Sequence, residues 1–281
     1  MRILLSNDDG IQAHGLKVLQ REFQKLGEVY VVAPLEEQSA TGHSLTIHKP
    51  LRILPMGDGF YGVSGSPADC VFLALREIMR KPPDIVISGI NRGANLAQDV
   101  YYSGTVSAAR EACIFGIPSL AVSLATDFKK LKSDVDYHYQ GAARLAVRVV
   151  KAMLKKPLPK RTFLNLNVPD IPMNKIKGIE LTRQGFRYYS GNILRRKDHR
   201  GRDYYWVGGS YEGFQNELGS DCYAVESGFA ALTPMKLDST DLQVLETLIE
   251  EGIEPRMKNG VLNLQRRRKA LTKTGKGRTR P

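Results

Sequence analysis

The chain has 281 residues, of which 42% are hydrophobic, and its formal net charge is +12. This length allows one large domain or a domain with an extension, and the apolar content supports a sizeable core. No apolar run approaches the ~20 residues that cross a bilayer, and the amino-terminal run is too short for a secretion signal, so we expect no membrane contact. The three cysteines, Cys70, Cys113 and Cys222, lack metal-type spacing, which favours a reducing, cytoplasmic setting.

The basic charge is concentrated at the carboxyl-terminal end. Residues 266–281 hold eight Lys and Arg residues and no acid, which leaves +4 for the rest of the chain. Residues 265–281 offer little that could build a core, so we expect a basic, disordered tail. Weak contact with RNA or polyphosphate and a purely solubilising role are both open for this tail.

Strand-like and helix-like segments alternate from the amino terminus. We predict strands at 2–6, 29–33, 84–88, 119–123 and 163–167, a hairpin at 52–63, and helices at about 16–26, 66–80, 105–115 and 138–155. The alternation predicts an α/β fold: a Rossmann-like, three-layer domain with a mostly parallel sheet, which we place at 1–177. The longest loops follow strands, and the carboxyl ends of parallel strands share the edge where ligands bind.

From Gly178 onward the character of the chain changes. Tyrosines and the single tryptophan lie among glycines and charged residues. This composition favours a β-hairpin-rich extension over further strand–helix units. A last helix with a leucine face is expected from Ser239 or Thr240 to Glu250. We therefore assign 178–264 to an aromatic-rich extension and a carboxyl-terminal helix packed with the core.

Asp8 and Asp9 directly follow the first strand, and Gly10 comes next. Neighbouring side chains on a strand point to opposite faces, so the two carboxylates can converge only where the chain leaves the strand. Carboxylates held together repel unless a cation neutralises them, and a hard divalent cation suits oxygen ligands. An ordinary Asp-Gly turn is the alternative reading of this motif.

Two further blocks carry polar residues in long loops. The first is Glu37-Gln38-Ser39-Ala40-Thr41-Gly42-His43-Ser44, and the second runs from Ser88-Gly89-Ile90-Asn91-Arg92-Gly93-Ala94-Asn95 to Tyr101-Tyr102-Ser103-Gly104-Thr105-Val106-Ser107. Together with Asn7–Gly10, these blocks closely resemble the SurE family of stationary-phase survival proteins. Members of that family are metal-dependent nucleotidases. The resemblance extends from Met1 to about Pro234 and includes 66–70 and 164–169.

The resemblance implies a set of metal ligands. These would be Asp8, Asp9, Ser39 and Asn91. A set made only of oxygen atoms favours one Mg²⁺ or Mn²⁺ per subunit over zinc, and it also accommodates Ca²⁺. Taken singly, Ser39 could be an ordinary loop hydroxyl and Asn91 an ordinary turn former.

The resemblance also implies a phosphate site. Asn95 would lie beside the phosphate, and Ser103, Gly104 and Thr105 would offer free amides and hydroxyls at a helix amino terminus. Plain helix capping by Ser103 or Thr105 is compatible with that role. Thr41, Gly42 and His43 are expected near the substrate; whether His43 acts directly on it is open.

The function implied is hydrolysis of nucleoside 5′-monophosphates by a metal-activated water, with Asp8, Asp9 and Asn95 as catalytic residues. Activity on 3′-monophosphates and short polyphosphate is open, and the resemblance implies a homodimer or tetramer formed through the extension. A haloacid-dehalogenase-type phosphatase would need an Asp-x-Asp pattern, whereas Asp8 and Asp9 are adjacent. A nucleic-acid-binding module is a second rival, but the sequence has no RNA-binding signature. A Rossmann dinucleotide enzyme is a third, but no Gly-x-Gly-x-x-Gly follows the first strand.

Overall fold

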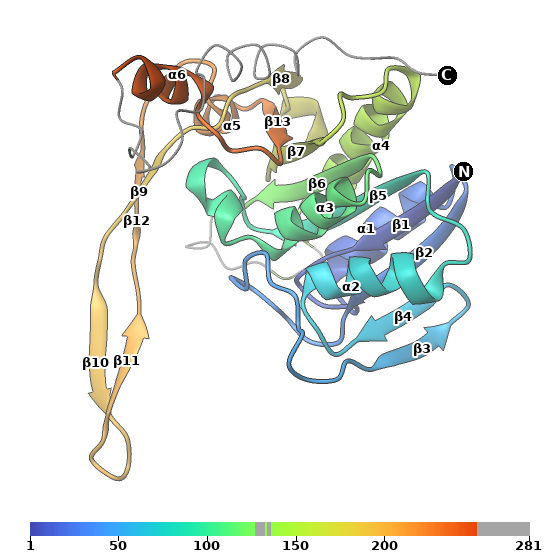
Figure 1. Ribbon diagram of the computed structural model, residues 1–281, viewed down its shortest axis with the longest axis horizontal. Helices are drawn as coiled ribbons and strands as arrows, with labels where there is room; N and C mark the ends of the chain where they lie inside the picture. Colours follow the sequence, from blue (N-terminus) through green and yellow to red (C-terminus); the bar gives the residue numbers. More distant parts are fainter. Residues whose placement is uncertain (127–132, 134–135, 252–281) are drawn as a thin grey trace, which may run out of the picture. The chain divides into compact units, whose positions relative to one another are not determined.

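A nine-stranded sheet is the frame of the computed structural model, which describes residues 1–126, 133 and 136–251 (Figure 1). The strand order across the sheet is β3-β4-β2-β1-β5-β6-β7-β13-β8. These strands are β1 (Arg2–Ser6), β2 (Glu28–Pro34), β3 (Ile53–Gly57), β4 (Phe60–Val63), β5 (Ile85–Arg92), β6 (Ser119–Ala125), β7 (Thr162–Pro169), β8 (Ile179–Leu181) and β13 (Ala230–Lys236). Neighbours from β4 to β7 run parallel, whereas β3 and β13 run antiparallel to β4 and β7.

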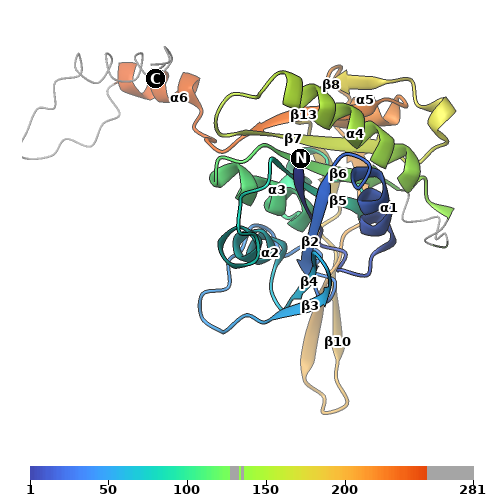
Figure 2. The same ribbon diagram turned by 90° about the vertical axis from the view of Figure 1, so that its right-hand side faces the viewer.

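Helices cover both faces of this sheet. Figure 2 shows α1 (His14–Phe23) and α4 (Tyr139–Lys155) on one side, and α2 (Pro67–Leu73) and α3 (Gly104–Ile114) on the other. Side chains of β1 alternate between the two layers: Ile3 and Leu5 pack with α1 and α4, and Leu4 packs with α2 and α3. The predicted three-layer α/β architecture is confirmed.

Several element boundaries differ from the prediction. Helix α1 ends at Phe23 rather than near residue 26, because the chain must turn to pair Glu28 of β2 with Arg2 of β1. The Glu28 amide donates to the Met1 carbonyl at 2.9 Å. Helix α2 ends at Leu73 and continues as a π-helical turn, η1 (Ala74–Ile78). Strand β5 runs on past its predicted end at 88 and, after a register shift, pairs Asn91 with Ser123 of β6.

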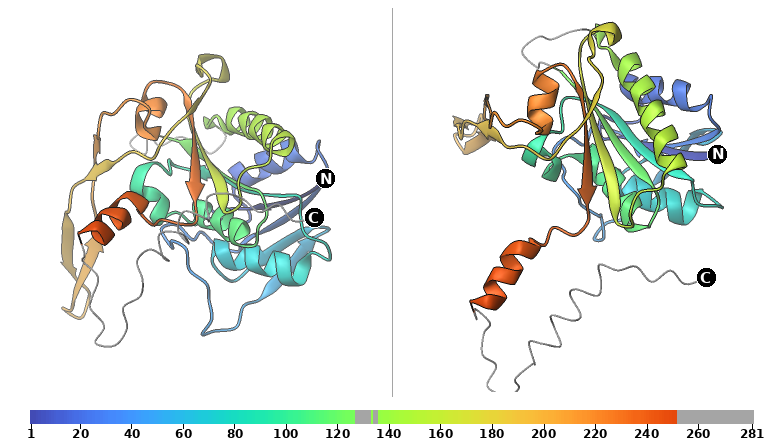
Figure 3. Two further views of the ribbon diagram at one scale, coloured as in Figure 1. Left: turned by 45° about the horizontal axis from the view of Figure 1, so that its top comes forward. Right: turned by 90° about the horizontal axis from the view of Figure 1, so that it is seen from above.

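The predicted extension contains hairpins, as expected, but two of its strands belong to the main sheet. Strand β9 (Arg187–Tyr189) pairs with β12 (Tyr211–Phe214), and β10 (Ile193–Lys197) pairs with β11 (Asp203–Val207). Figure 3 shows this ribbon standing away from the main sheet. Strands β8 and β13 extend the sheet beyond β7, and α5 (Asp221–Glu226) packs on β13 and β7. Two short 3₁₀ turns lie elsewhere in the chain: η2 (Ala97–Tyr101) precedes α3, and η4 (Met173–Lys175) precedes β8.

Met1–Leu237 form one compact unit, and a second unit begins at Asp238. Its described part, residues 238–251, contains α6 (Leu242–Glu250), which matches the predicted last helix and is capped by the Asp241 carboxylate. The basic tail at 265–281 lies outside the described residues, and the functional division at 177 and 264 stays a prediction. Among the described helices, none is long and apolar enough to cross a membrane. The three cysteines are free thiols.

Candidate active site

Helix α3 begins directly against Asp8. The Asp8 side chain is buried, and the Thr105 hydroxyl donates a hydrogen bond to its Oδ1. A Cβ on Gly104 would lie 2.7 Å from the Cβ of Asp8, so no larger residue fits there without displacement. Burial raises the pKa of Asp8, and hydrogen bonds from Thr105 and Gly104 oppose that rise. The predicted anion site at this helix end therefore faces a carboxylate.

Asp9 lies beside Asp8 where the chain leaves β1. Its Oδ2 accepts a hydrogen bond from the Arg92 backbone amide at 3.0 Å. Gly10 follows with a φ of +94°, which is the departure expected of it. Burial and the charge of Asp8 raise the pKa of Asp9 to about 7. The protein's own groups thus do not neutralise the two carboxylates, which a bound cation would do.

The three polar loops meet at this edge of the sheet, as predicted. The Gln38 amide donates to the Asp8 carbonyl at 2.8 Å, which ties the first loop to the end of β1. Asn91 lies at the end of β5, and its Nδ2 donates to the Gly93 carbonyl at 2.9 Å. The Ser39 hydroxyl donates to Glu37 Oε1 at 2.6 Å.

The residues at this edge fit a hard cation in chemistry. Asp9 Oδ1 and the amide oxygen of Asn91 accept no hydrogen bond within the described part of the chain. The oxygen Oδ1 of Asn7 is buried there without a hydrogen-bond partner. Among the described residues, no group of three or more His, Cys, Asp or Glu side chains is placed so that it could hold a metal ion. A cation here would therefore depend on two carboxylates and neutral oxygens, which suits Mg²⁺ or Mn²⁺.

Asn95 is held by three polar residues of the neighbouring strands. Its backbone amide donates to Asn167 Oδ1 at 2.8 Å, and its carbonyl accepts from the Nδ2 atoms of Asn165 and Asn167. Its own Nδ2 donates to the Ser123 hydroxyl at 2.8 Å. Because an amide nitrogen carries two hydrogens, one remains for a ligand. This framework fixes Asn95 tightly at the carboxyl ends of β6 and β7.

The remaining predicted substrate residues lie on the loop of residues 35–52. His43 Nε2 lies 2.7 Å from Oε2 of Glu111, a buried residue of α3. The Gly42 amide donates to the Tyr102 carbonyl at 3.0 Å, and the Thr41 hydroxyl donates to the Gln38 carbonyl at 2.9 Å. These bonds hold the loop close to the start of α3.

Three residues that hold this site were not predicted. Glu111 is a buried acid in the middle of a helix, a pattern that signals a buried partner. Asn165 and Asn167 alternate on a buried strand and share one face, which signals a polar site beneath that strand. The partners themselves, His43 and Asn95, are distant in sequence, so only the fold reveals them.

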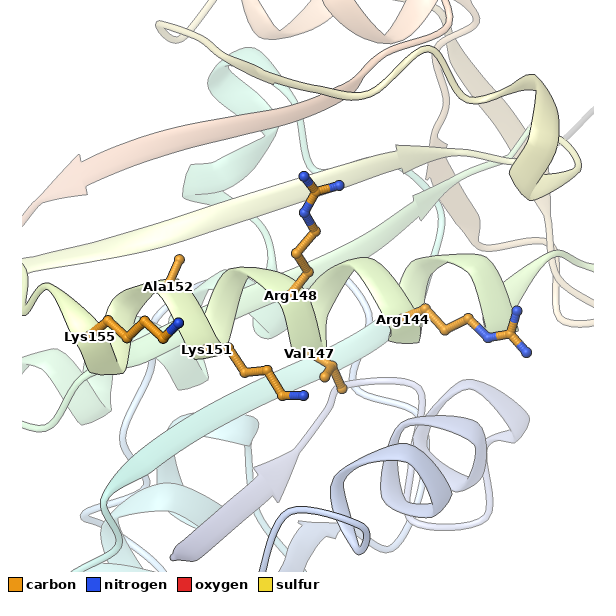
Figure 4. Close-up of a pocket in the computed structure, with 6 residues that line it drawn as sticks. All are labelled: Arg144, Val147, Arg148, Lys151, Ala152 and Lys155. Atoms are coloured by element: carbon orange, nitrogen blue, oxygen red, sulfur yellow. The ribbon is translucent and has the colours of Figure 1, made fainter.

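A separate shallow hollow lies on the outer side of α4 (Figure 4). No predicted site residue lines it. Its basic side chains recur at helical spacing, which places them on one exposed face. The hollow is lined by Arg144, Val147, Arg148, Lys151, Ala152 and Lys155.

Comparison with known proteins identifies the chain's relatives. A family model described as survival protein SurE matches residues 3–191. The chain belongs to the SurE family. A relative from Geotalea daltonii named 5′-nucleotidase SurE is 48% identical, with 88% of this chain and 98% of that protein covered. One of the same name from Pelobacter propionicus is 46% identical at the same coverage.

A solved SurE structure agrees with the fold. The crystal structure of the SurE protein from Aquifex aeolicus has a TM-score of 0.77 and is 39% identical in sequence. The match covers 90% of this chain and all of that one. The resemblance drawn from the three sequence blocks is confirmed.

Proposed function

We propose that this protein is a metal-dependent phosphomonoesterase that hydrolyses nucleoside 5′-monophosphates to nucleosides and phosphate. The observation that carries the proposal is the contact between two features: the adjacent carboxyl groups of Asp8 and Asp9 at the end of β1, and the amino terminus of α3, whose Thr105 hydroxyl donates to the buried Asp8. The first suits a divalent cation and the second suits a phosphate. Relatives that share nearly half of the sequence are named 5′-nucleotidases.

In this proposal Asp8, Asp9, Ser39 and Asn91 hold the cation. A bound divalent cation supplies charge for the phosphate oxygens and lowers the pKa of a water molecule. We assign Mg²⁺ or Mn²⁺ as the metal, one ion per subunit, because every proposed ligand atom is oxygen.

The chain's own residues then bind and orient the phosphate. The positive end of α3, at Ser103, Gly104 and Thr105, faces its oxygens, and the Ser103 hydroxyl, which accepts from the Val106 amide, keeps a hydrogen to donate to one of them. The free hydrogen on Asn95 Nδ2 donates to another phosphate oxygen, where charge develops during the reaction. Asp9 Oδ1 orients the attacking water and receives its proton. Thr41, Gly42 and His43 close over the substrate, with Glu111 holding the imidazole.

A phosphate-release assay tests this function. The purified protein is incubated with nucleoside 5′-monophosphates, 3′-monophosphates, diphosphates and short polyphosphate, each with Mg²⁺, Mn²⁺ or excess chelator. We expect release from 5′-monophosphates that needs added metal and is abolished by chelation. The other substrates measure how wide the specificity is. Turnover that survives excess chelator would contradict the metal mechanism, and no release from any mononucleotide would contradict the nucleotidase.

We also propose that the chain works as a homodimer or tetramer. The ribbon formed by β10 and β11 exposes apolar side chains that no described residue covers: Ile193 is 63% exposed, Trp206 62% and Val207 91%. Exposed apolar surface of this kind marks protein contacts. A second copy of the same chain is the partner that the family resemblance implies.

A further inference from the structure

A second cavity lies beside the candidate phosphate site, and nothing described above uses it. Its volume is about 670 Å³, within the range of small-molecule sites. Its walls come from the segment after β5, the end of β6, strands β9 and β12, and helix α5. Among the lining residues are Ala94, Asp99, Ala125, Tyr189, Tyr211 and Val225.

Two backbone links place this cavity next to the phosphate site. The Asp99 carbonyl accepts a hydrogen bond from the Ser103 amide at 3.1 Å, so one wall leads directly into the start of α3. Ala125 lies two residues beyond Ser123, the strand partner of Asn91. At about 3.3 Å per residue, that wall begins roughly 7 Å along β6 from Ser123, the residue paired with the proposed metal ligand Asn91. The cavity and the phosphate site are thus neighbours on one edge of the sheet.

The wall contributed by β9 and β12 is aromatic and firmly fixed. The rings of Tyr189 and Tyr211 have centroids 5.9 Å apart, and each residue is nearly half exposed. The Tyr189 hydroxyl donates to Asp99 Oδ2 at 2.6 Å, and Arg187 Nη1 donates to the same oxygen at 2.7 Å. The Arg187 guanidinium also lies 4.7 Å from the centroid of the Tyr211 ring. Exposed, immobilised rings are surfaces on which a planar base can stack.

The polar atoms of the cavity suit a neutral ligand with hydroxyl or amine groups. Arg187 Nε is buried without a hydrogen-bond partner. The exposed Glu226 carboxylate forms no hydrogen bond or ion pair with the described residues. A carboxylate repels phosphate but accepts hydrogen bonds from ribose hydroxyls or from the exocyclic amine of a base. A bound nucleotide would therefore point its phosphate away from Glu226, toward Ser103.

We propose that this cavity binds the nucleoside part of the substrate, with the base against Tyr189 and Tyr211. The proposal rests on the nucleotidase function above and adds the subsite that distinguishes a nucleotide from other phosphomonoesters. Remote contacts of this kind increase kcat/KM by positioning the reacting phosphate.

A variant that fills the cavity tests the proposal. Val225→Trp places an indole in it from α5, and Leu154→Trp adds the same side chain to an exposed site on α4 as the matched control. Steady-state rates are measured with adenosine 5′-monophosphate and with ribose 5-phosphate, which lacks the base. We expect Val225→Trp to lower kcat/KM for the nucleotide by about tenfold or more, while ribose 5-phosphate and the control change by less than about twofold. Adenosine should inhibit the unaltered protein competitively, with a Ki raised about tenfold by Val225→Trp.

The outcomes separate this proposal from the function on which it rests. Failure of the unaltered protein to hydrolyse either substrate contradicts the nucleotidase itself. Equal losses on both substrates, or no loss, overturn the subsite. A fall in molecular mass on light scattering that accompanies the loss also overturns it, because the surface would then belong to a contact between copies.

A second variant covers the case in which Val225→Trp does not fold. Tyr211→Leu removes one stacking ring, and we expect it to lower kcat/KM for the nucleotide about threefold or more with little effect on ribose 5-phosphate. Tyr101→Leu tests the competing platform, since Tyr101 is 58% exposed at the same edge of the sheet. A larger selective loss in Tyr101→Leu than in Tyr211→Leu would place the base on Tyr101 and overturn the proposal.

Discussion

At the scale of single residues, Asp8 and Asp9 are held differently although they are neighbours. Asp8 accepts hydrogen bonds from the start of α3, whereas Asp9 has one backbone donor, Arg92, and retains a free carboxylate oxygen within the described residues. Asp9 is thus the better candidate to contact both metal and water. Removing its charge should cost activity more than stability.

We expect Asp9→Asn to abolish nearly all phosphate release while the fold persists. The pKa of Asp9 is raised from 3.8 to about 7, so the folded state favours the protonated acid. In the metal-free protein this carboxyl therefore lowers the free energy of unfolding progressively as pH rises from about 4 to 7. Asparagine does not ionise, so the variant keeps the free energy of unfolding that the unaltered protein loses as pH rises. Its unfolding temperature at about pH 8 with chelator should therefore equal or exceed that of the unaltered protein. Calorimetry checks this, and a marked fall in unfolding temperature would show that Asp9 has a structural role instead.

Gly104 allows α3 to approach Asp8, and its substitution tests that approach. Alanine is a better helix former than glycine by about 1 kcal/mol, so propensity alone predicts that Gly104→Ala is stabilising. The added Cβ would nevertheless lie 2.7 Å from Asp8 Cβ and 2.9 Å from Pro67 Cγ. We expect kcat/KM for a mononucleotide to fall about tenfold or more as Asp8 and the helix move apart. Gly191→Ala, whose Cβ would meet nothing within 4 Å, is the control and should leave the rate unchanged.

At the scale of elements, β7 supports the site through its two buried asparagines. Asn167 makes two hydrogen bonds to the backbone of Asn95, and Asn165 makes one. Asn167→Ala should lower the free energy of unfolding by about 1–3 kcal/mol, because it leaves the buried backbone amide of Asn95 without its acceptor. It should also reduce kcat more than Asn165→Ala does. Denaturant titration and steady-state rates of both variants provide the measurement. Equal effects would mean that the bonds to the Asn95 backbone do not position its side chain.

The sequence predicted the elements whose signals are local. Short apolar runs that alternate with helix-like segments indicate β1, β2, β6 and β7. The Ser66-Pro67 start of α2 is visible because capping depends on adjacent residues. Strand β13 was missed because its pairing with β7 joins residues far apart in the chain. The continuation of β5 was missed because Gly89 and Gly93 make 89–93 look like a loop.

The site was predictable in its composition but not in its supports. Asp8, Asn91, Asn95 and the start of α3 follow strands or open a helix, so topology alone brings them to one edge. The bond between His43 and Glu111 depends on how a long loop folds back, which no local pattern encodes. The cavity beside the site is likewise formed by β9, β12 and α5 together.

At the scale of the whole molecule, the exposed ribbon of β10 and β11 predicts self-association. We expect light scattering at micromolar protein to give two or four times the chain mass of 31.3 kDa. Replacing Trp206 and Val207 by serine should reduce this mass, because both side chains are mostly exposed in the single chain and would be buried in the assembly. Leu181→Ser, at another exposed site, is the control. A monomer with full activity would contradict the proposal.

The basic tail at 265–281, which lies outside the described residues, is expected to affect the binding of polyanions but not the hydrolysis of small substrates. We expect truncation after Gln265 to leave kcat/KM for a mononucleotide within about twofold, because charges outside the active site act weakly on a small anion when the Debye length is ~8 Å. Binding of RNA or polyphosphate should weaken strongly, because many phosphates pair with the tail at once and release counterions. Its dependence on salt should flatten accordingly, which filter binding across a salt series would measure.

The basic face of α4 remains in the truncated chain, so residual binding that Arg148→Ala and Lys151→Ala remove would locate a second polyanion contact there. Loss of mononucleotide hydrolysis on truncation would instead show that the tail takes part in the active site or in assembly.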